Sequence, residues 1–192
     1  MVIAAVAGYM LGSIPAAVLV GRFFRIDPRS KGDGNPGWWN MRHLLGNRAA
    51  FWVLLVDVSK GALAAGVGLA VWGPWWTAYV AVAFAMLGHA FPVFAQFRGG
   101  RSVLTFTGGM AVLAPLPVTI AIVAGAVVGI AGQRFAYGGR VAMFLFPVVQ
   151  AGFDPRARVL FTGVLMTFIG FRFLTARSPA PATSSQGAEL SA

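Results

Sequence analysis

Long apolar runs separated by short polar stretches dominate the first half of the chain. Residues 2–20, 49–72 and 75–95 are each predominantly apolar. Each run is close to the roughly 20 residues that a helix needs to cross a bilayer. None of them alternates between apolar and polar residues at period two, which is the pattern of a membrane β-barrel. The pattern therefore predicts an all-α fold, that of a polytopic helical integral membrane protein.

The second half of the chain carries shorter apolar segments. Residues 103–132 are too few for two full spans of about 20 residues each, and Pro115 and Pro117 predict a break near their middle. We expect two short helices that turn at these prolines, and a partly re-entrant arrangement is left open. Further apolar runs occupy residues 141–151 and 157–174. Seven transmembrane segments are expected, with five or six as alternatives.

The composition is that of a membrane protein, and it excludes every kind of site that depends on cysteine. Hydrophobic residues make up 58% of the chain and charged residues only 10%, against about 25% charged residues in a typical soluble domain. The chain contains no cysteine, which excludes disulfides, thiolate metal sites and a cysteine nucleophile. The first apolar run has no Lys or Arg before it, so it is predicted to be a retained helix and not a signal peptide.

The net charge of +10 is interpreted as a sign of orientation in the membrane. In a soluble protein it would suggest nucleic acid, a partner that we do not expect here. Basic residues are concentrated in the predicted loop 21–48, so the positive-inside rule puts this loop in the cytoplasm and the N-terminus outside. The uncharged linker Gly73–Pro74 suits the outer side. The charged residues of the loop are Arg22, Arg25, Arg29, Lys31, Arg42, Arg48, Asp27 and Asp33, and the tryptophans expected to form an interfacial belt are Trp72, Trp75 and Trp76.

One integral membrane domain is expected over residues 1–177. Residues 178–192 are rich in Ser, Ala, Pro and Thr, which predicts a disordered tail. Gly125 and Gly129 are four residues apart, a spacing that permits the close approach of two helices, with ordinary helix packing as the alternative to a special role.

Polar residues inside the apolar runs are the first candidates for chemistry, because they are costly in a membrane. Asp57 and Lys60 lie three residues apart, so they share a helix face and are expected to pair. The pair is either a structural ion pair or a means of aiming the lysine at a phosphate. His89 lies near the inner end of the next run, where a packed structural role and a catalytic role both stay open.

The stretch FRGGRS, which ends at Ser102, combines two glycines with two arginines just before an expected helix start. Gly99 and Gly100 are expected to expose backbone N–H groups toward an anion. Arg98 and Arg101 are expected to grip phosphate oxygens. The alternative is a flexible loop with two cytoplasmic arginines.

A second candidate loop, GDGNPGWWNMR, begins at Gly32. Its glycines permit tight turns close to a ligand, its asparagines supply amides, and Arg42 supplies a guanidinium group. Trp38 and Trp39 are expected to anchor the loop among lipid headgroups or to line an acyl entry. The residues expected to contact a substrate phosphate are Gly34, Asn35, Gly37 and Asn40.

These motifs resemble those of the bacterial membrane glycerol-3-phosphate acyltransferases that use acyl-phosphate as donor. The matching pieces occur in order over roughly residues 8–110: GSIP at 12–15, GDGNPGWWN at 32–40, Arg42, DVSKG at 57–61 and GHAFPVFAQFRGGRSVLT at 88–105. The family pattern reads GSIP, then GSGNPGATN with an arginine two residues beyond, then D-x-x-K-G and GHxFPxFxxFKGGKGVAT.

The resemblance implies a seven-helix protein of the bacterial cell membrane, with its active-site loops facing the cytoplasm. It implies acyl transfer from acyl-phosphate to the 1-hydroxyl of glycerol 3-phosphate, which gives lysophosphatidic acid for phospholipid synthesis. These two substrates and membrane lipids are the expected partners, no metal or cofactor is implied, and the oligomeric state stays open. The expected catalytic residues are Asp33, Arg42 and His89, and Lys60 joins Arg98, Gly99, Gly100, Arg101 and Ser102 as an expected phosphate ligand.

The chain departs from the family pattern at several positions. Asp33 stands where the family has Ser, and we expect Lys31 or Arg42 to neutralise it unless it serves as a general base. Two tryptophans replace Ala-Thr, and RGGRS replaces KGGKG, so that Ser102 stands in place of a glycine.

The end of the chain departs as well, because the terminal family motif RHxxNIxRLxxGxE is reduced to Arg172 and Arg177. The alternative function is therefore a non-catalytic paralogue that binds a lipid phosphate or a membrane partner. A small transporter or channel is a third reading, which the gathering of polar residues at one face does not favour.

Overall fold

The computed structural model describes residues 1–71 and 73–175, and every regular element among them is helical. The all-α fold predicted from the apolar runs is therefore confirmed. Trp72 and the tail 178–192, for which a belt position and disorder were predicted, lie outside the described residues. The helices are α1 (Val2–Gly12), α2 (Ala16–Phe23), α3 (Trp38–Ala70), α4 (Thr77–Ala90), the 3-10 helix η1 (Val93–Ala95), α5 (Val103–Leu113), α6 (Pro115–Ala131), α7 (Phe135–Gln150) and α8 (Arg156–Thr175).

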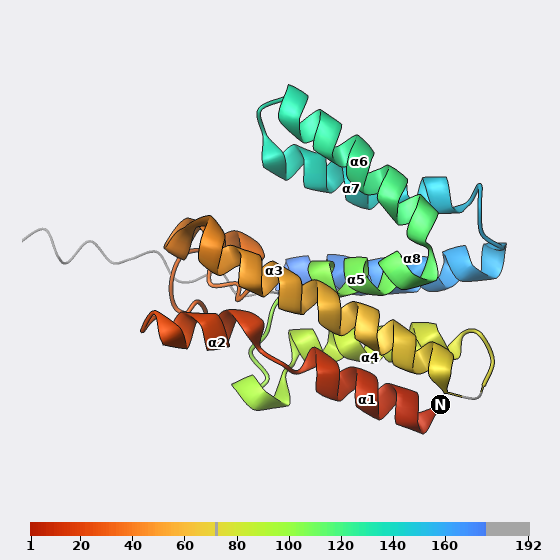
Figure 1. The fold of residues 1–192 in the computed structure, drawn as a ribbon, viewed down its shortest axis with the longest axis horizontal. Helices are drawn as coiled ribbons and strands as arrows, with labels where there is room; N and C mark the ends of the chain where they lie inside the picture. The colour runs from red at the N-terminus through yellow and green to blue at the C-terminus, as the bar shows by residue number, and fades with distance from the viewer. Residues whose placement is uncertain (72, 176–192) are drawn as a thin grey trace, which may run out of the picture.

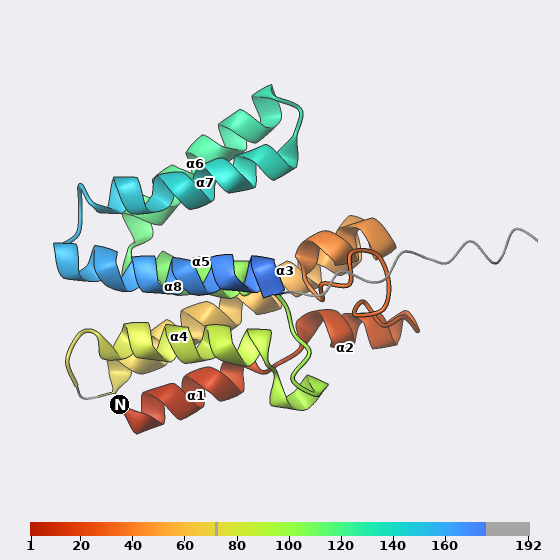
Figure 2. The ribbon, with the colours of Figure 1, turned by 180° about the vertical axis from the view of Figure 1, so that it is seen from behind.

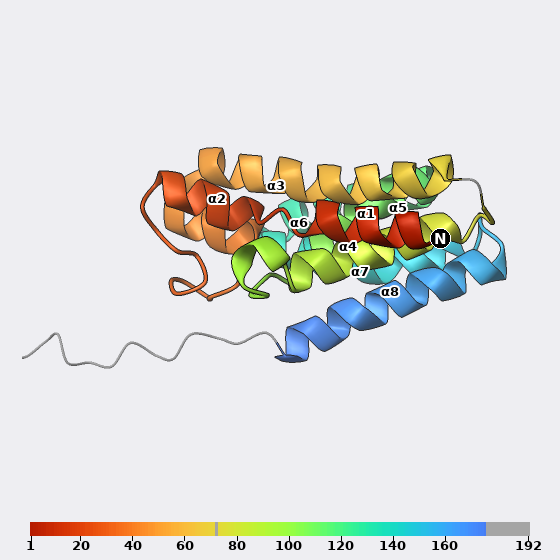
Figure 3. The same cartoon turned by 90° about the horizontal axis from the view of Figure 1, so that it is seen from below.

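The long helices run side by side as a bundle (Figures 1 and 2). Helix α3 packs against α5 and α4, and α4 packs against α1. Seen from below, α8 crosses one side of this bundle (Figure 3). Helices α6 and α7 form a hairpin beside it and approach closely at glycines, as the spacing of Gly125 and Gly129 permits: a Cβ on Gly138 would lie 3.0 Å from the Cα of Gly129.

Within residues 1–71 and 73–175, four stretches are long and apolar enough to cross a membrane: Val2–Phe23, Trp38–Ala70, Thr77–Ala95 and Arg156–Thr175. Shorter apolar helices occupy Val103–Leu113 and Pro115–Ala131. With α1 and α2 counted as one segment and α7 added, the described residues contain the seven expected segments. The predicted break in the second half falls at Pro115, where α6 begins.

The first segment is broken, although residues 2–20 were predicted to be continuous. Helix α1 ends at Gly12 and α2 begins at Ala16, with Pro15 as the N-cap residue of α2. Proline has no N–H to donate, and its ring clashes with the preceding helical turn, so a helix stops before it. The break exposes the carbonyl of Ile14, which accepts a hydrogen bond from Lys60 Nζ at 3.2 Å.

Two predicted loops are partly helical. Helix α3 begins at Trp38 and not near residue 49, with an internal break where Gly46 adopts φ 79°. Arg134 and Arg140 predict a cytoplasmic loop over residues 133–140, but α7 begins at Phe135, so this stretch is mostly helix. Gly138, in the first turn of α7, forms a close-packing surface against α6.

A matched pair of glycines in α3 tests the packing of α3 on α5. A Cβ on Gly61 would overlap the carbonyl oxygen of Thr105, whereas a Cβ on Gly66 would meet no atom within 4 Å. We expect Gly61→Ala to lower the thermal unfolding temperature in detergent, since overpacking costs about 1–3 kcal/mol. Gly66→Ala should be neutral or stabilising, because alanine favours a helix over glycine by about 1 kcal/mol. Equal unfolding temperatures for the two variants would contradict this packing.

Candidate active site

The predicted pair of Asp57 and Lys60 is confirmed, and it is buried. Lys60 Nζ lies 2.8 Å from Asp57 Oδ1, and the two side chains are 3% and 2% exposed. Both residues lie one turn apart on α3, and Lys60 also reaches the Ile14 carbonyl at the break between α1 and α2. The ion pair therefore joins α3 to the broken first segment, inside the protein and away from water.

His89, from the last turn of α4, joins this pair. Its Nδ1 lies 3.4 Å from Asp57 Oδ1, and the residue is 8% exposed. The FRGGRS loop covers the imidazole: a Cβ on Gly100 would lie 2.5 Å from His89 Nε2. A glycine is required at this position because the loop lies directly on the ring.

The backbone N–H groups of Gly99 and Gly100 are hydrogen-bonded within the protein, which contradicts the expectation that they are exposed toward an anion. Gly99 donates to the Ala90 carbonyl and Gly100 to the His89 carbonyl, each at 3.1 Å. The loop doubles back on the end of α4, which turns its N–H groups inward. Its carbonyls point the other way and accept hydrogen bonds from Arg172, at 3.3 Å for Gly100 and 3.4 Å for Gly99.

Arg172 also lines the candidate site, although the sequence identified it only as a remnant of the terminal family motif. It comes from the end of α8, is 8% exposed and lies over the ring of Phe91 at 4.8 Å. The available signal was an arginine within the last apolar run, since ionisable residues in such runs point to function. What the sequence did not reveal is that α8 ends beside the FRGGRS loop.

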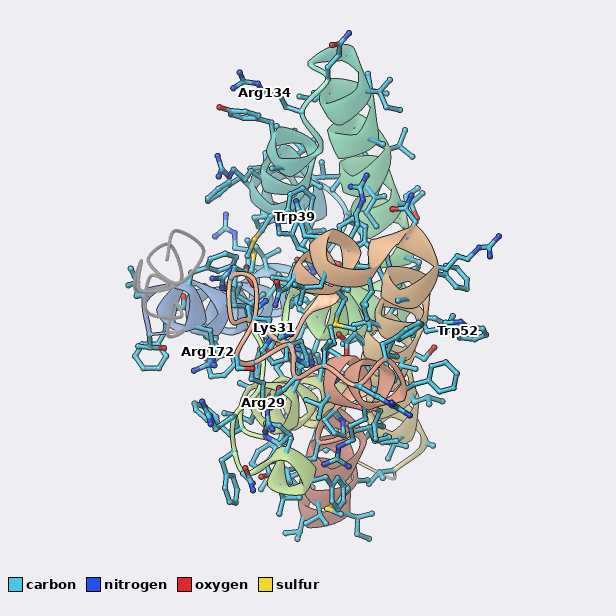
Figure 4. The ribbon with its side chains drawn as sticks, turned by 90° about the vertical axis from the view of Figure 1, so that its left-hand side faces the viewer. Arg29, Lys31, Trp39, Trp52, Arg134 and Arg172 are labelled. Atoms are coloured by element: carbon cyan, nitrogen blue, oxygen red, sulfur yellow. The ribbon has the colours of Figure 1, made fainter. Side chains whose placement is uncertain are left out.

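A cleft of about 380 Å³ opens at this end of the bundle. In Figure 4, which views that end, Arg29, Lys31 and Arg172 gather around the loops, while Arg134 lies far off on the α6–α7 hairpin. Three arginines from separate segments, Arg29, Arg98 and Arg172, line the cleft. Its lining residues are Arg29, Gly34, Asn35, Pro36, Phe91, Phe97, Arg98, Gly99, Arg172 and Thr175.

A small cavity lies next to the cleft and shares part of its wall. Pro36, Arg98 and Gly99 line both spaces. The smaller one is also lined by Asp57, Lys60, His89 and Gly100. The guanidinium groups thus stand at an open cleft, with the buried ion pair and the imidazole behind it.

The loop that begins at Gly32 is held in shape by Asn40. The amide of Asn40 donates to the Pro28 and Lys31 carbonyls, each at 2.9 Å, and accepts the N–H of Asp33 at 3.1 Å. Asn40 is only 2% exposed, and both hydrogens of its amide are used. Its expected phosphate contact is replaced by a loop-holding role.

Other residues of this loop divide into two groups. Gly34, with φ 69°, and Asn35 line the cleft, and their contact with a substrate phosphate stays a prediction. Gly37 is the N-cap residue of α3 and donates its N–H to the Asn35 carbonyl at 2.8 Å. It is not among the residues that line the cleft.

Asp33 is neutralised, though not by the expected partners. Its Oδ2 lies 3.8 Å from Arg101 Nη1, and its Oδ1 accepts the N–H of Asn35 at 3.0 Å. Arg101 also lies over the ring of Phe173 at 4.7 Å. The expected neutralisation by Lys31 or Arg42 is replaced by an ion pair that ties one candidate loop to the other.

Arg42 and Ser102 both form hydrogen bonds within the protein. Arg42 Nε donates to Asn47 Oδ1 at 3.0 Å. Its guanidinium group lies over the rings of Trp38 and Trp39, at 5.6 and 5.8 Å from their centroids. Arg42 is not among the residues that line the cleft. The Ser102 hydroxyl donates to the Met86 carbonyl at 2.8 Å, and its backbone is left-handed at φ 64°. That conformation favours glycine, which fits the glycine of the family pattern.

A further ion pair, between Asp27 and Arg29, holds one of the arginines that line the cleft. Arg29 forks onto Asp27, with Nη2 2.8 Å from Oδ2, and its Nη1 donates to the Ala95 carbonyl at 3.1 Å. Hydrogen bonds from the Arg29 side chain lower the pKa of the Asp27 carboxyl below its usual value. Asp27 therefore stays ionised and holds Arg29 in place.

Known proteins are similar to this chain over most of its length. A glycerol-3-phosphate acyltransferase from Symbiobacterium thermophilum is 41% identical over 151 residues, covering 78% of this chain and 74% of the relative. Glycerol-3-phosphate acyltransferase 2 from Moorella thermoacetica is 37% identical over 164 residues, covering 84% of each.

The fold is similar to that of a solved membrane protein. The crystal structure of PlsY, described as an integral membrane glycerol 3-phosphate acyltransferase in its glycerol 3-phosphate form, aligns with a TM-score of 0.81 at 22% identity, over 96% of this chain and 97% of that one. The model of the family described as "Glycerol-3-phosphate acyltransferase" matches residues 2–177. With nearly the whole described chain matched, this protein belongs to the glycerol-3-phosphate acyltransferase family.

Proposed function

We propose that this protein transfers an acyl group from acyl-phosphate to the 1-hydroxyl of glycerol 3-phosphate. The products are lysophosphatidic acid and inorganic phosphate. One observation carries the proposal: Arg29, Arg98 and Arg172, from separate segments, line one cleft whose wall is shared with the buried His89 cavity. Both substrates carry a phosphate, and guanidinium groups bind phosphate oxygens through paired hydrogen bonds.

The reaction we propose is a direct transfer between the two substrates. The hydroxyl oxygen of glycerol 3-phosphate attacks the acyl carbon, the bond from that carbon to the phosphate oxygen breaks, and the hydroxyl proton ends on the departing phosphate. Acyl-phosphate is already activated, so no acyl-enzyme is needed. The buried Ser102 supports this, because its hydroxyl is donated to the Met86 carbonyl. The protein contributes orientation and cationic groups near the developing negative charge.

We propose that the guanidinium groups of Arg98 and Arg172 bind the substrate phosphates, and we call this pair the phosphate grip. Arg172 uses Nε and Nη2 on the Gly100 and Gly99 carbonyls, which leaves Nη1 for a ligand. Arg98 lines both the cleft and the cavity behind it. Of the three expected catalytic residues, His89 is best supported because it lines that cavity. Asp33 is instead paired with Arg101, and Arg42 lies over the tryptophan rings.

We also propose that the cleft faces the cytoplasm. The loop Phe24 to Gly37 and the FRGGRS loop bring their arginines to the same end of the bundle. Lys and Arg accumulate on the cytoplasmic side of membrane proteins. Both substrates are phosphorylated and charged, so delivery from the cytoplasm needs no step across the bilayer.

Replacing Arg98 tests the phosphate grip. We expect Arg98→Gln to lower kcat/KM about a hundredfold or more, since a cationic or hydrogen-bonding group at a developing charge contributes on this scale. The measurement is lysophosphatidic acid formation by protein reconstituted in lipid vesicles. Arg134→Gln, remote on the hairpin in Figure 4, is the charge-matched control and should keep full activity. Equal rates for Arg98→Gln and the wild type would remove Arg98 from the site.

A double-substitution cycle separates the structural role of the buried ion pair from its functional one. Asp57→Leu and Lys60→Met should each destabilise the protein by about 3–5 kcal/mol, because each leaves one buried charge without its partner. The double variant should regain most of the thermal stability and stay inactive. A double variant with wild-type turnover would mean that the pair only holds the fold.

Asp33→Ser restores the family residue and tests the bridge to Arg101. Freed from the carboxylate, Arg101 is expected to lower the KM for glycerol 3-phosphate by up to about fivefold, since an exposed ion pair is worth at most about 1 kcal/mol. The value of kcat should change little. A large fall in kcat would instead assign Asp33 a catalytic role of its own.

A further inference from the structure

A second hollow, of about 290 Å³, shares Arg29 with the cleft of the proposed active site. We propose that it binds the phosphate of an anionic phospholipid headgroup. The site is distinct from the cleft, although Arg29 contributes to both walls. Its lining residues are Val18, Arg22, Arg25, Ile26, Asp27 and Arg29, all from α2 and the turn after it.

The charges of this hollow favour an anion. Three guanidinium groups and one carboxylate line it. The carboxylate of Asp27 is taken up by Arg29, with contacts at 2.8, 3.0 and 3.1 Å. Arg22 and Arg25 form no ion pair with a carboxylate of residues 1–71 and 73–175. Two positive charges are therefore left for a ligand.

The backbone holds one of these arginines in an unusual conformation. Helix α2 ends in a turn in which Phe24 and Ile26 donate to the Gly21 carbonyl at 3.0 and 2.9 Å, while Arg25 adopts φ 58°. Glycine is the usual residue in this left-handed position after a helix. Arginine here therefore costs conformational free energy, and its contribution to the hollow offers a reason for its presence. The turn also occupies the Gly21 and Arg22 carbonyls near the end of α2, which would otherwise repel an anion.

Exposed apolar side chains beside the hollow identify the occupant as a lipid. Leu19 and Phe23, four residues apart on α2, are 48% and 84% exposed, and Phe24 is 47% exposed with its ring edge-on to Phe23. Exposed aromatic residues next to arginines suit the headgroup level of a membrane. Acyl chains would lie along Leu19 and Phe23 while the phosphate enters the hollow. A pocket near 300 Å³ is at the small end of ligand sites, which fits a headgroup without its chains.

The test uses the full-length protein in neutral detergent micelles with added phosphatidylglycerol or phosphatidylcholine. Phosphatidylglycerol is expected to raise the thermal unfolding temperature of the wild type, because a ligand of the folded state stabilises it. Arg25→Gly should weaken the apparent affinity about fivefold, as expected for one arginine near an anionic lipid. This variant relieves the left-handed backbone, so lost binding cannot be attributed to misfolding. Arg25→Lys should retain most of the binding.

The experiment has a control variant of equal charge and a control anion without acyl chains. Arg140→Gln, exposed on α7, should bind like the wild type, and adding Arg22→Gln to Arg25→Gly should weaken binding further. An equal loss in Arg140→Gln, or no loss in Arg25→Gly, would overturn the site. Equal stabilisation by inorganic phosphate at the same concentration would also overturn it, since a small anion would then suffice. Binding is measured without turnover, so failure of the proposed reaction would leave this result interpretable.

Discussion

The buried ion pair between Asp57 and Lys60 is the interaction on which the rest of the site depends. Two charges at 3% and 2% exposure are costly inside a membrane protein unless each finds a partner. Lys60 finds a second partner in the Ile14 carbonyl, which is available only because Pro15 breaks the first segment. Asp57 finds one in His89, 3.4 Å away on α4. The pair thus fixes three segments relative to one another.

From that centre the contacts lead outward to the cleft. The carbonyl of His89 accepts the N–H of Gly100, which lays the FRGGRS loop over the imidazole and turns its carbonyls toward Arg172 on α8. The same loop places Arg98 at the cleft and Arg101 against Asp33. A rigid buried core thereby presents cationic side chains from otherwise separate loops. Positioning of this kind suits a reaction in which the donor is already activated and the protein has mainly to orient two phosphates.

Local features of this fold could be predicted from the sequence, and features that depend on tertiary contact could not. The spacing of Asp57 and Lys60 determines that they share a helix face, and Pro115 determines where α6 starts, since both effects act within a helical turn or two. The inward N–H groups of Gly99 and Gly100 depend on where α4 ends in space, and the role of Arg172 depends on the docking of α8. The partners expected for Asp33, Lys31 or Arg42, were chosen from nearby in the sequence and were wrong, because Arg101 approaches Asp33 from a distant loop.

The most direct test of the account is the donor dependence of turnover by the purified protein in lipid vesicles. Palmitoyl-phosphate and glycerol 3-phosphate should give lysophosphatidic acid and inorganic phosphate in equal amounts, with no acylated protein detectable by mass spectrometry when the donor is added alone. That result would support direct transfer in a cleft that holds both phosphates. Turnover with an acyl thioester but not with palmitoyl-phosphate, or a stable acyl-enzyme, would contradict it.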